Sequence, residues 1–285
     1  MDIVRQIYSL PRGLEPGVEV FAFGDVHGRS DLLAALIEAA AAEPRSSERR
    51  VVVFLGDLID RGPDSLGAIR RAMAAGAALQ ADEVVGLTGN HEAMMRMALD
   101  RGVPEWDALQ AFMTWRRNGG RRVLAQFAPE EGQGAIDEEL QAARAALPAD
   151  IAAWLEAQKS HWRNGQLLFV HAGVHPGRPL ESFLAAPWNT PLDVLNEDAH
   201  WAWIRGPFLE HRPGPYGFSG YFVVHGHTPN DLRPDPSTAE QIRHFRLNLD
   251  SGSVMTGVAT MAIFRGAGAE IVTARGPSSD WRVDG

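Results

Sequence analysis

The sequence predicts an α/β fold, in which short buried strands alternate with helices. Short apolar runs rich in Val, Phe and Leu end abruptly at Gly, Asp, His or Asn, as buried strands do. Helical patterns separate the first three runs, and strand–helix–strand alternation indicates βαβ units. Polar clusters follow the ends of the runs, which is where α/β proteins bind ligands. The predicted strands are residues 18–23, 51–55, 84–87, 166–170 and 221–224.

Two helices are predicted between the first three strands. Residues 30–42 start at a favourable N-cap, Ser30 or Asp31. Residues 63–76 carry Pro at the first turn and Gly at the end, the positions at which helices favour these two residues. Each helix therefore connects one predicted strand to the next.

Residues 91–160 contain no strand-like run, and their apolar residues recur at helical spacing. The pattern is broken at residues 102–104 and 119–120. We therefore expect a helical insertion between the third and fourth strands, comprising residues 93–163. We expect it to form a cap over the end of the sheet where the polar clusters lie, within one domain that spans residues 1–285.

The C-terminal part of the chain predicts further strands. Residues 242–250, 258–264 and 269–274 alternate between apolar and polar side chains, as half-buried strands do. We expect these segments to be antiparallel strands that belong to a mixed sheet or to a second sheet.

Composition excludes several kinds of site and partner. The net charge of −9 gives the 285-residue chain no general attraction to nucleic acid or anionic membranes. The absence of cysteine excludes disulfides, thiolate nucleophiles and Cys-ligated metals. We find neither a signal-peptide pattern nor an apolar run of the ~20 residues that span a membrane. We expect a cytoplasmic protein without nucleic-acid or membrane partners, and the sequence gives no indication of an oligomeric state.

Polar clusters follow all five predicted strands, and each is adjacent to glycine. Glycine permits tight turns and a close approach of the backbone. Because ligands bind beyond the carboxyl ends of the strands in an α/β sheet, we expect the clusters to converge. They are GDVHG with Asp25 and His27, GDLIDRG with Asp57, Asp60 and Arg61, GNHE with Asn90, His91 and Glu92, HAG with His171, and HGHTP with His225 and His227.

Carboxylates and imidazoles without cysteine suit a divalent ion such as manganese, iron or zinc. Taken singly, an Asp after a strand is more often a turn former or helix cap, and a lone His more often belongs to the core or surface. Five such clusters at five strand ends favour a metal site instead. They offer more ligands than one ion needs, so we expect two ions about 3.5–4 Å apart that share a carboxylate.

In this order, the five motifs resemble the signature of the phosphoprotein phosphatase family within the calcineurin-like metallophosphoesterases. The resemblance spans residues 20–252. It is closest to the bacterial branch, which includes small serine/threonine protein phosphatases and diadenosine tetraphosphate hydrolases. It implies a four-layer α/β/β/α sandwich with the metals at the strand ends, and we expect two divalent ions there, Mn²⁺ with Fe or Zn as alternatives. The implied ligands are Asp25, His27 and Asp57 for one ion, and Asp57, Asn90, His171 and His227 for the other.

The resemblance also implies catalytic roles that agree with elementary chemistry. A water bridging two divalent ions becomes hydroxide near neutral pH, since its pKa falls to about 7, and can attack phosphorus in line. Arg61 and Arg205, with Asn90, are expected to bind the phosphate and neutralise its charge. The leaving oxygen needs a proton, which is assigned to His91, with Asp60 keeping that imidazole protonated.

Several residues keep two interpretations. His227 follows the glycine of HGHTP and is chosen as the metal ligand, which leaves His225 to contact a ligand or the substrate. Glu92 is expected to orient backbone or a group beside the metals from the first turn of a helix. The arginines of WRRNGG, residues 115–120, either reach a substrate phosphate or form a solvated face. Asp250 is expected to form a turn rather than to touch a metal ligand.

Three functions follow from the site. The first is hydrolysis of phosphomonoesters, with phosphoserine and phosphothreonine in proteins as the expected substrates. The alternative is hydrolysis of a phosphoanhydride in a dinucleoside tetraphosphate or a capped RNA end. The third is a binding module without catalysis, which would have lost metal ligands or the acid histidine. All of these residues are present, which disfavours the third function.

Overall fold

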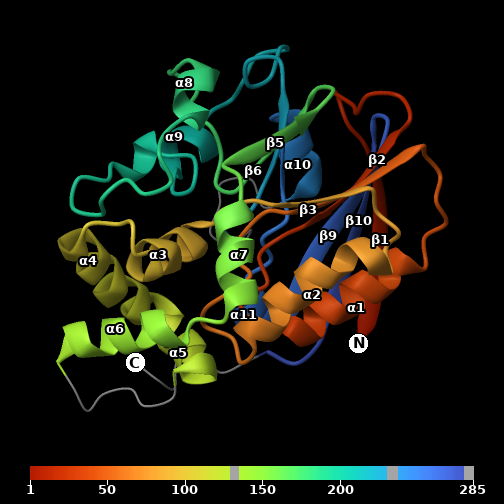
Figure 1. The fold of residues 1–285 in the computed structure, drawn as a ribbon. Helices are drawn as coiled ribbons and strands as arrows, with labels where there is room; N and C mark the ends of the chain where they lie inside the picture. The colour runs from red at the N-terminus through yellow and green to blue at the C-terminus, as the bar shows by residue number, and fades with distance from the viewer. Residues whose placement is uncertain (129–134, 230–236, 279–285) are drawn as a thin grey trace.

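The computed structural model describes residues 1–128, 135–229 and 237–278, which form two β-sheets surrounded by helices (Figure 1). The six-stranded sheet has the order β1-β10-β9-β2-β3-β4, and the four-stranded sheet the order β5-β6-β7-β8. The strands are β1 (Asp2–Ser9), β2 (Val18–Phe23), β3 (Arg49–Phe54), β4 (Glu83–Gly86), β5 (His161–Asn164), β6 (Leu167–Val170), β7 (Phe222–His225), β8 (Arg246–Asn248), β9 (Val258–Arg265) and β10 (Gly268–Arg275).

Helices flank both sheets. Within the described residues they are α1 (Ser30–Ala41), α2 (Ser65–Ala78), α3 (Asn90–Leu99), α4 (Glu105–Trp115), α5 (Arg121–Phe127), α6 (Ile136–Ala146), α7 (Ala149–Ala157), α8 (Leu180–Leu184), α9 (Gly206–Leu209), α10 (Thr238–Arg243) and α11 (Ser253–Thr256), with a π-helical turn at Arg116–Gly120 and a 3₁₀ turn at Glu197–Ala199. None of the helices in the described part of the chain is long and apolar enough to cross a membrane.

The two sheets pack face to face because side chains alternate along each strand. Phe169 of β6 meets Phe264 of β9 edge to face, with ring centroids 5.5 Å apart. Val20 and Ala22 of β2 also face this layer between the sheets. Phe21 faces the opposite layer, against α1 and α2. The predicted sandwich of helices, sheet, sheet and helices is therefore confirmed.

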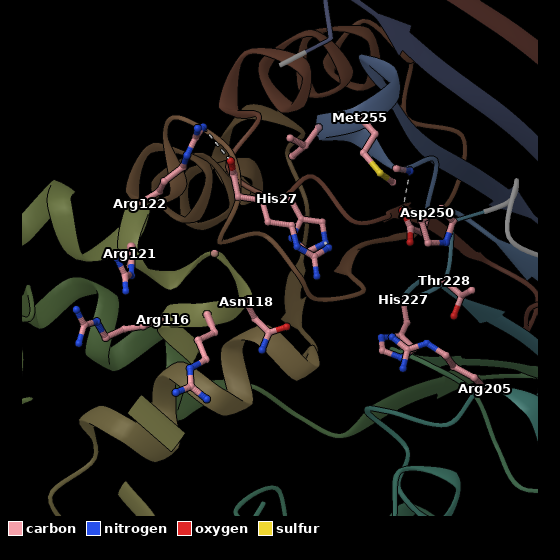
Figure 2. A pocket seen from close by; sticks show the side chains of 16 residues that line it. His27, Arg116, Asn118, Arg121, Arg122, Arg205, His227, Thr228, Asp250 and Met255 are labelled. Atoms are coloured by element: carbon pink, nitrogen blue, oxygen red, sulfur yellow. Dashed lines mark hydrogen bonds between the residues drawn. The ribbon is translucent and has the colours of Figure 1, made fainter. Parts of the chain in front are cut away.

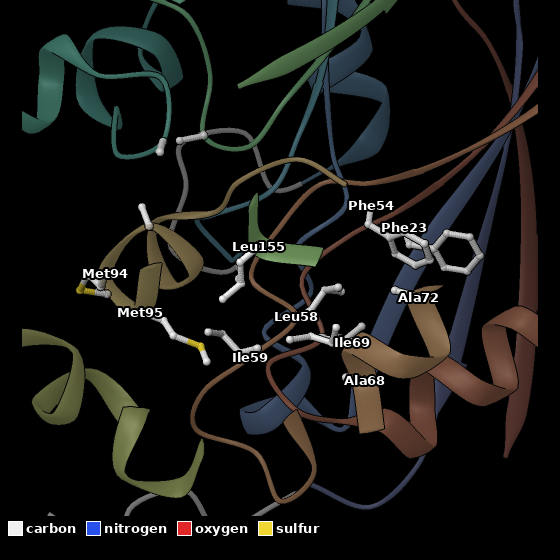
Figure 3. Packing of buried hydrophobic residues seen from close by; sticks show 14 of the residues in the cluster. Phe23, Phe54, Leu58, Ile59, Ala68, Ile69, Ala72, Met94, Met95 and Leu155 are labelled. Atoms are coloured by element: carbon white, nitrogen blue, oxygen red, sulfur yellow. The ribbon is translucent and has the colours of Figure 1, made fainter. Parts of the chain in front are cut away.

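Figure 3 shows how the helical layer packs on the six-stranded sheet. Phe23 of β2 and Phe54 of β3 stack with ring centroids 5.0 Å apart. Ile69 of α2, Met95 of α3 and Leu155 of α7 belong to the same buried cluster. The core thus joins the sheet to the helices on both sides of the GDLIDRG segment, which fixes that segment between them.

Parallel pairing brings the polar motifs to one edge of the molecule. β2, β3 and β4 pair in parallel, and so do β6, β7 and β8. Each motif lies at the C-terminal end of one of these strands or shortly after it. β9 and β10 are antiparallel, as predicted. The prediction was wrong for β8, which pairs in parallel with β7 because α10 reverses the chain between them.

Two strands were not predicted from the sequence. β1 forms the edge of the large sheet, and seven of its eight residues are exposed, so it has no apolar face to detect. β5 reads HWRN and carries no apolar run. The predicted insertion, residues 93–163, therefore starts inside α3 and ends inside β5. Its helices lie between β4 and β5 in the chain, and its assignment as a cap remains a prediction.

The first predicted helix also starts slightly differently. Ser30 is the first residue of α1, and its hydroxyl donates to Asp64 rather than capping its own helix. Asp64 is the N-cap of α2, where its carboxylate accepts from the Gly67 amide at 2.9 Å. One acidic side chain therefore joins the starts of both helices.

Candidate metal centre and active site

Three histidines are oriented by backbone carbonyls. His27 Nδ1 donates to Ile59 O at 2.8 Å, and His171 Nδ1 donates to Leu55 O at 2.9 Å. His227 differs because its Nε2 donates to Trp203 O, at 3.1 Å. A carbonyl only accepts, so the facing nitrogen carries the proton and the other presents a lone pair. This is how metal-ligating histidines are held.

Asp57 lies at the junction of two groups of possible ligands. One group is Asp57 with His27 and His91, and the other is Asp57 with His171 and His227. Within each group the ligand atoms lie within 4.8 Å of one another, and all five side chains are buried. The expectation that Asp57 bridges two ions agrees with this placement. The first group contains His91, whereas the sequence predicted Asp25 as the third ligand beside His27 and Asp57.

Lone pairs converge where the second ion is expected. Asn90 Oδ1 lies 2.9 Å from His227 Nδ1 and 3.2 Å from His171 Nε2. His171 Nε2 is also 3.5 Å from Asp57 Oδ1. When these nitrogens are deprotonated, as metal ligation requires, the three atoms face one another as acceptors. A cation between them would turn that repulsion into coordination, so this donor set fits a divalent ion.

Asp25 provides a second indication that a cation fits this site. Its Oδ2 accepts from the His227 amide at 2.9 Å, while its buried Oδ1 has no hydrogen-bond partner among the described residues. A Cβ on Gly226 would lie 1.9 Å from that Oδ1, so only glycine allows the approach. Burial, together with Asp250 and Asp57, raises the pKa of Asp25 well above its usual 3.8. A bound cation would offset that cost.

Charge is unevenly distributed over the site. Burial opposes ionisation of Asp57, but His171 and His91 hold its pKa well below 3.8. The pKa of His171, which burial lowers, is raised to about 9 by Asp57. Burial and Arg61 lower the pKa of His27 to about 4. Asp57 is therefore an anion at neutral pH, as a bridging ligand must be.

Glu92 braces the turn that carries Asp57. Its two carboxylate oxygens accept from the amides of Asp57 and Leu58, both at 2.7 Å, and from Gly89 at 3.2 Å. It is fully buried, and burial and Asp57 raise its pKa to about 7. The expectation that Glu92 orients backbone is therefore met. It ties the loop after β3 to the start of α3.

His91 belongs to a chain of hydrogen bonds that starts in the predicted insertion. Trp115 Nε1 of α4 donates to Asp60 Oδ1 at 2.8 Å, and Asp60 Oδ2 lies 2.5 Å from His91 Nδ1. Arg61 Nη2 donates to His91 Nε2 at 2.8 Å, while its Nη1 donates to His27 Nε2 at 3.1 Å. Burial lowers the pKa of His91 well below 6.5, and Arg61 adds to this shift while Asp57 opposes it. With Arg61 donating to its Nε2 the imidazole is neutral, so the expectation that Asp60 keeps His91 protonated is not met in this arrangement.

Backbone strain is concentrated at the site. Non-glycine residues with positive φ are uncommon, and they persist only where the surroundings enforce them. Five of the eight in the described chain are motif residues, and two of these, Asp60 and Arg61, are consecutive. The five are His27 (φ 45°), Asp57 (51°), Asp60 (73°), Arg61 (64°) and His227 (71°).

A cavity of about 590 Å³ opens over these residues (Figure 2). His27, Arg61, His227 and Arg205 line it. Arg205 is exposed and lies 3.5 Å from Glu197, so it is available at the cavity wall rather than buried in the metal site. Figure 2 shows Arg205 beside His227, across the cavity from the side chains of the predicted insertion. The cavity is wide enough for a phosphate and the group that carries it.

His225 and Asp250 lie beside the site. The two histidines of HGHTP diverge because His227 leaves the strand at positive φ. The His225 ring packs edge to face on Phe208, with centroids 4.9 Å apart, whereas His227 faces Asn90. Asp250 Oδ1 accepts from the Gly252 amide at 2.8 Å, the expected turn.

The structure brings all of the predicted site residues to one region, with His225 and Glu92 behind the others. Trp115 and the arginines near it were the residues that sequence reasoning did not assign. WRRNGG carried the only signal, since it combines an aromatic donor with cations inside an otherwise helical segment.

Comparisons with known proteins agree with this geometry. Residues 18–257 match the calcineurin-like phosphoesterase family. A serine/threonine-protein phosphatase 1 from Salmonella typhimurium is 28% identical over 247 residues, which cover 85% of this chain and 90% of that protein. A symmetrical bis(5'-nucleosyl)-tetraphosphatase from Acidovorax sp. is 30% identical over 172 residues, 58% of this chain and 48% of that protein.

Solved structures share the fold at lower identity. A putative diadenosine tetraphosphatase aligns with a TM-score of 0.53 and 20% identity, over 95% of this chain and 99% of that one. A cold-active protein-tyrosine phosphatase from Shewanella aligns with a TM-score of 0.50 and 17% identity, over 89% and 78% of the two chains. With the motif geometry and the family match over residues 18–257, these likenesses lead to one assignment: the chain belongs to the calcineurin-like phosphoesterase family.

Proposed function

We propose that this protein is a metal-dependent phosphatase that hydrolyses phosphomonoesters, with phosphoserine and phosphothreonine in proteins as its substrates. The observation that carries the proposal is the pairing of His91 with Asp60 beside the two ligand groups that share Asp57. The similarity to a serine/threonine-protein phosphatase over 90% of that protein's length supports the substrate class.

We propose that two divalent ions, of which manganese suits this donor set, bind at the shared Asp57. When bound, such ions act as Lewis acids and lower the pKa of a coordinated water to about 7. His91 is not assigned as a ligand because its Nδ1 pairs with the carboxylate of Asp60, whereas each proposed histidine ligand holds one ring nitrogen against a backbone carbonyl. The proposed ligands are Asp25, His27 and Asp57 for one ion, and Asp57, Asn90, His171 and His227 for the other.

The remaining residues bind and protonate the substrate. Arg61 and Arg205 donate to phosphate oxygens and neutralise their charge, with Asn90 nearby. Once the Arg61 guanidinium turns to the phosphate, His91 Nε2 is released to hold the proton that goes to the leaving oxygen. Asp60 fixes the opposite ring nitrogen, which keeps Nε2 directed at the cavity.

Hydrolysis of a dinucleoside tetraphosphate is the second candidate. It is supported by the 30% identity to symmetrical tetraphosphatases, although the match spans about half of their length. The same ligands and the same acid would serve a phosphoanhydride, so the two functions differ in what the cavity admits. The serine/threonine-protein phosphatase 1 is matched over 90% of its length and the symmetrical tetraphosphatase over 48%, which is why we place this candidate second.

The decisive experiment compares the two substrate classes in one assay. Purified protein with manganese is given a panel of phosphoserine and phosphothreonine peptides and, in parallel, diadenosine tetraphosphate, and release of phosphate or nucleotide is followed. We expect higher kcat/KM for the peptides. A large preference for the dinucleotide would overturn the choice of substrate class.

Two variants test the chemistry itself. His91→Asn removes the acid and should lower kcat on peptides by about 10²-fold or more, the typical contribution of general acid catalysis. Asp57→Asn removes the shared ligand and should abolish activity. If both variants retained wild-type activity, or if a chelator had no effect, the proposed site would be wrong. Absence of all turnover in the wild type would favour a binding module instead.

A further inference from the structure

The cavity above the metal centre has a charge opposite to that of the whole chain. The net charge of the protein is −9, yet six of the residues that line the cavity are arginines. Asp250 is the one carboxylate among the described lining residues, and it is buried. Six arginines are more than a single phosphate group requires, since Arg61 and Arg205 suffice to bind one phosphate. The surplus comes from residues 116–122, which form the π-helical turn after α4 and the start of α5.

Two of these four additional arginines have structural partners. Arg116 pairs with Glu139 of α6 at 2.8 Å, and Arg122 Nη1 donates to Arg61 O at 3.1 Å. Arg117 and Arg121 differ from them. Both are exposed, both line the cavity, and neither side chain has an ion pair or hydrogen bond with another described residue. Structural contacts therefore account for the presence of Arg116 and Arg122, but not for that of Arg117 and Arg121.

The segment that carries these arginines rests directly on Arg61. The Arg61 amide donates to Gly119 O at 3.4 Å, and a Cβ on Gly119 would lie 2.8 Å from Arg61 Cγ. Gly119 also has φ 111°, a conformation that side chains other than glycine rarely adopt. Arg117 and Arg121 are thus each two residues from a backbone fixed against the phosphate-binding arginine. A free surface helix would not have that constraint.

The far wall of the cavity has a different character. Pro229, Val254 and Met255 line it, and Met255 is exposed although it is apolar. Figure 2 shows Arg116 and Arg121 on one side and Met255 on the other, with His27 between them. A substrate seated at His27 therefore meets cations on the side of the insertion and an apolar surface on the opposite side.

We propose that Arg117 and Arg121 form a second anion subsite, which binds another phosphoryl or carboxylate group of the molecule whose phosphate lies at the metal centre. The proposal deepens the proposed function and rests on it for the position of the first phosphate. The second anion is an acidic or phosphorylated neighbour in a phosphopeptide, or a further phosphate in a nucleotide polyphosphate. Small monoesters lack that group and bind at the metal centre alone.

The test uses the double variant Arg117→Ala, Arg121→Ala and three kinds of substrate. One is a phosphoserine peptide flanked by aspartates, which is compared with the same peptide flanked by alanines. The second is diadenosine tetraphosphate, and the third is p-nitrophenyl phosphate. The matched control is Arg71→Ala, Arg101→Ala, which removes two arginines that are also exposed and lie outside the cavity.

In the wild type we expect the aspartate-flanked peptide to be preferred. In the double variant its kcat/KM should fall about 10- to 100-fold, as expected when hydrogen bonds to a charged group are lost. Values for the alanine-flanked peptide and p-nitrophenyl phosphate should not change, and the control variant should behave as the wild type. A fall confined to diadenosine tetraphosphate would identify the second anion as a polyphosphate. An equal fall on every substrate, or no fall on any, would overturn the subsite.

A binding measurement separates this proposal from the proposed function. Fluorescence anisotropy with the two labelled peptides requires no turnover. If the wild type binds the aspartate-flanked peptide more tightly and the double variant loses that difference, the subsite stands even where no hydrolysis is detected. If hydrolysis proceeds but neither peptide is preferred in binding or in kcat/KM, and diadenosine tetraphosphate is unaffected by the variant, the phosphatase assignment stands and the subsite is overturned.

Discussion

At the scale of single residues, the site is built from side chains whose second contact is fixed. Each proposed histidine ligand uses one nitrogen for a backbone carbonyl, and His91 uses one for Asp60. Such contacts set the ring orientation before a metal or substrate arrives. The motifs themselves could be identified from the sequence because Asp and His after five strand ends are a specific pattern. Trp115 could not, since nothing in its neighbourhood indicates which carboxylate its indole would meet.

Trp115→Phe tests that contact. The change keeps an aromatic ring in the core but removes the donor to Asp60 Oδ1, so the carboxylate is held by fewer bonds. We expect kcat on a phosphoserine peptide to fall by up to about 10-fold, the value of one hydrogen bond, with KM unchanged. p-Nitrophenyl phosphate, whose leaving group needs little protonation, should be affected much less. Steady-state kinetics on both substrates measure the difference.

The matched control is Trp106→Phe, on the same helix, where the side chain is 65% exposed. It should leave both substrates unaffected. An equal loss of kcat on the two substrates for Trp115→Phe would mean that the indole supports the fold rather than the acid.

At the scale of elements, the strands that could be predicted from the sequence are the buried ones. β2, β3, β6 and β7 are buried along most or all of their length, and their apolar runs located each of them to within two residues. β1 and β5 were missed because an exposed strand or a short polar strand shows no alternation of apolar and polar residues. The direction of β8 could not be predicted from its own three residues, since it depends on how α10 returns the chain. Strand pairing is a non-local property, and alternation within a segment does not encode it.

The start of β2 contains a buried ion pair that stability measurements can test. Glu19 accepts from Arg50 Nε at 2.8 Å, both side chains are buried, and Arg265 adds a bond at 3.2 Å. Glu19→Gln leaves Arg50 without its charge partner. We expect the free energy of unfolding in urea at pH 7 to fall by about 3–5 kcal/mol, as when one member of a buried pair is removed.

The pH dependence of that loss follows from the pKa of Glu19. Burial works against the carboxylate, but Ser46 and Arg50 lower its pKa below the usual 4.5. The stabilisation is therefore fully present above pH 4.5 and is lost as the pH falls through the lower folded-state pKa. The difference between wild type and variant should shrink in that acidic range. Glu83→Gln, in the exposed pair with Arg49, should cost at most about 1 kcal/mol at any pH.

At the scale of the whole molecule, the proposed metal centre joins the two sheets. Asp57 follows β3 of the large sheet, whereas His171 and His227 follow β6 and β7 of the small one. The motifs and the resemblance were sufficient to predict this convergence and the sandwich that produces it. They did not predict the cavity, because its walls combine residues from the insertion with residues near the C-terminus, and such contacts depend on the complete packing.

Removing metal should therefore weaken the entire fold. Binding to the native state alone stabilises it by about 2.7 kcal/mol when free metal exceeds Kd 100-fold. We expect manganese to raise the thermal midpoint of chelator-treated protein, measured by calorimetry. Asp57→Asn should lose that rise, whereas Asp193→Asn, an exposed carboxylate outside both ligand groups, should keep it. A rise of equal size in Asp57→Asn would place the stabilising metal elsewhere.

The close contact of Gly119 with Arg61 limits how this segment could be exchanged between related proteins. A foreign segment grafted in place of residues 105–127 would need glycine at position 119, where any side chain collides with Arg61. It would also have to keep the donor of Trp115 to Asp60 and that of Arg122 to the Arg61 carbonyl. The exposed side chains of Arg117 and Arg121 carry no such requirement, so evolution or a designer could change them, and with them the recognition surface, while these anchoring residues stay in register.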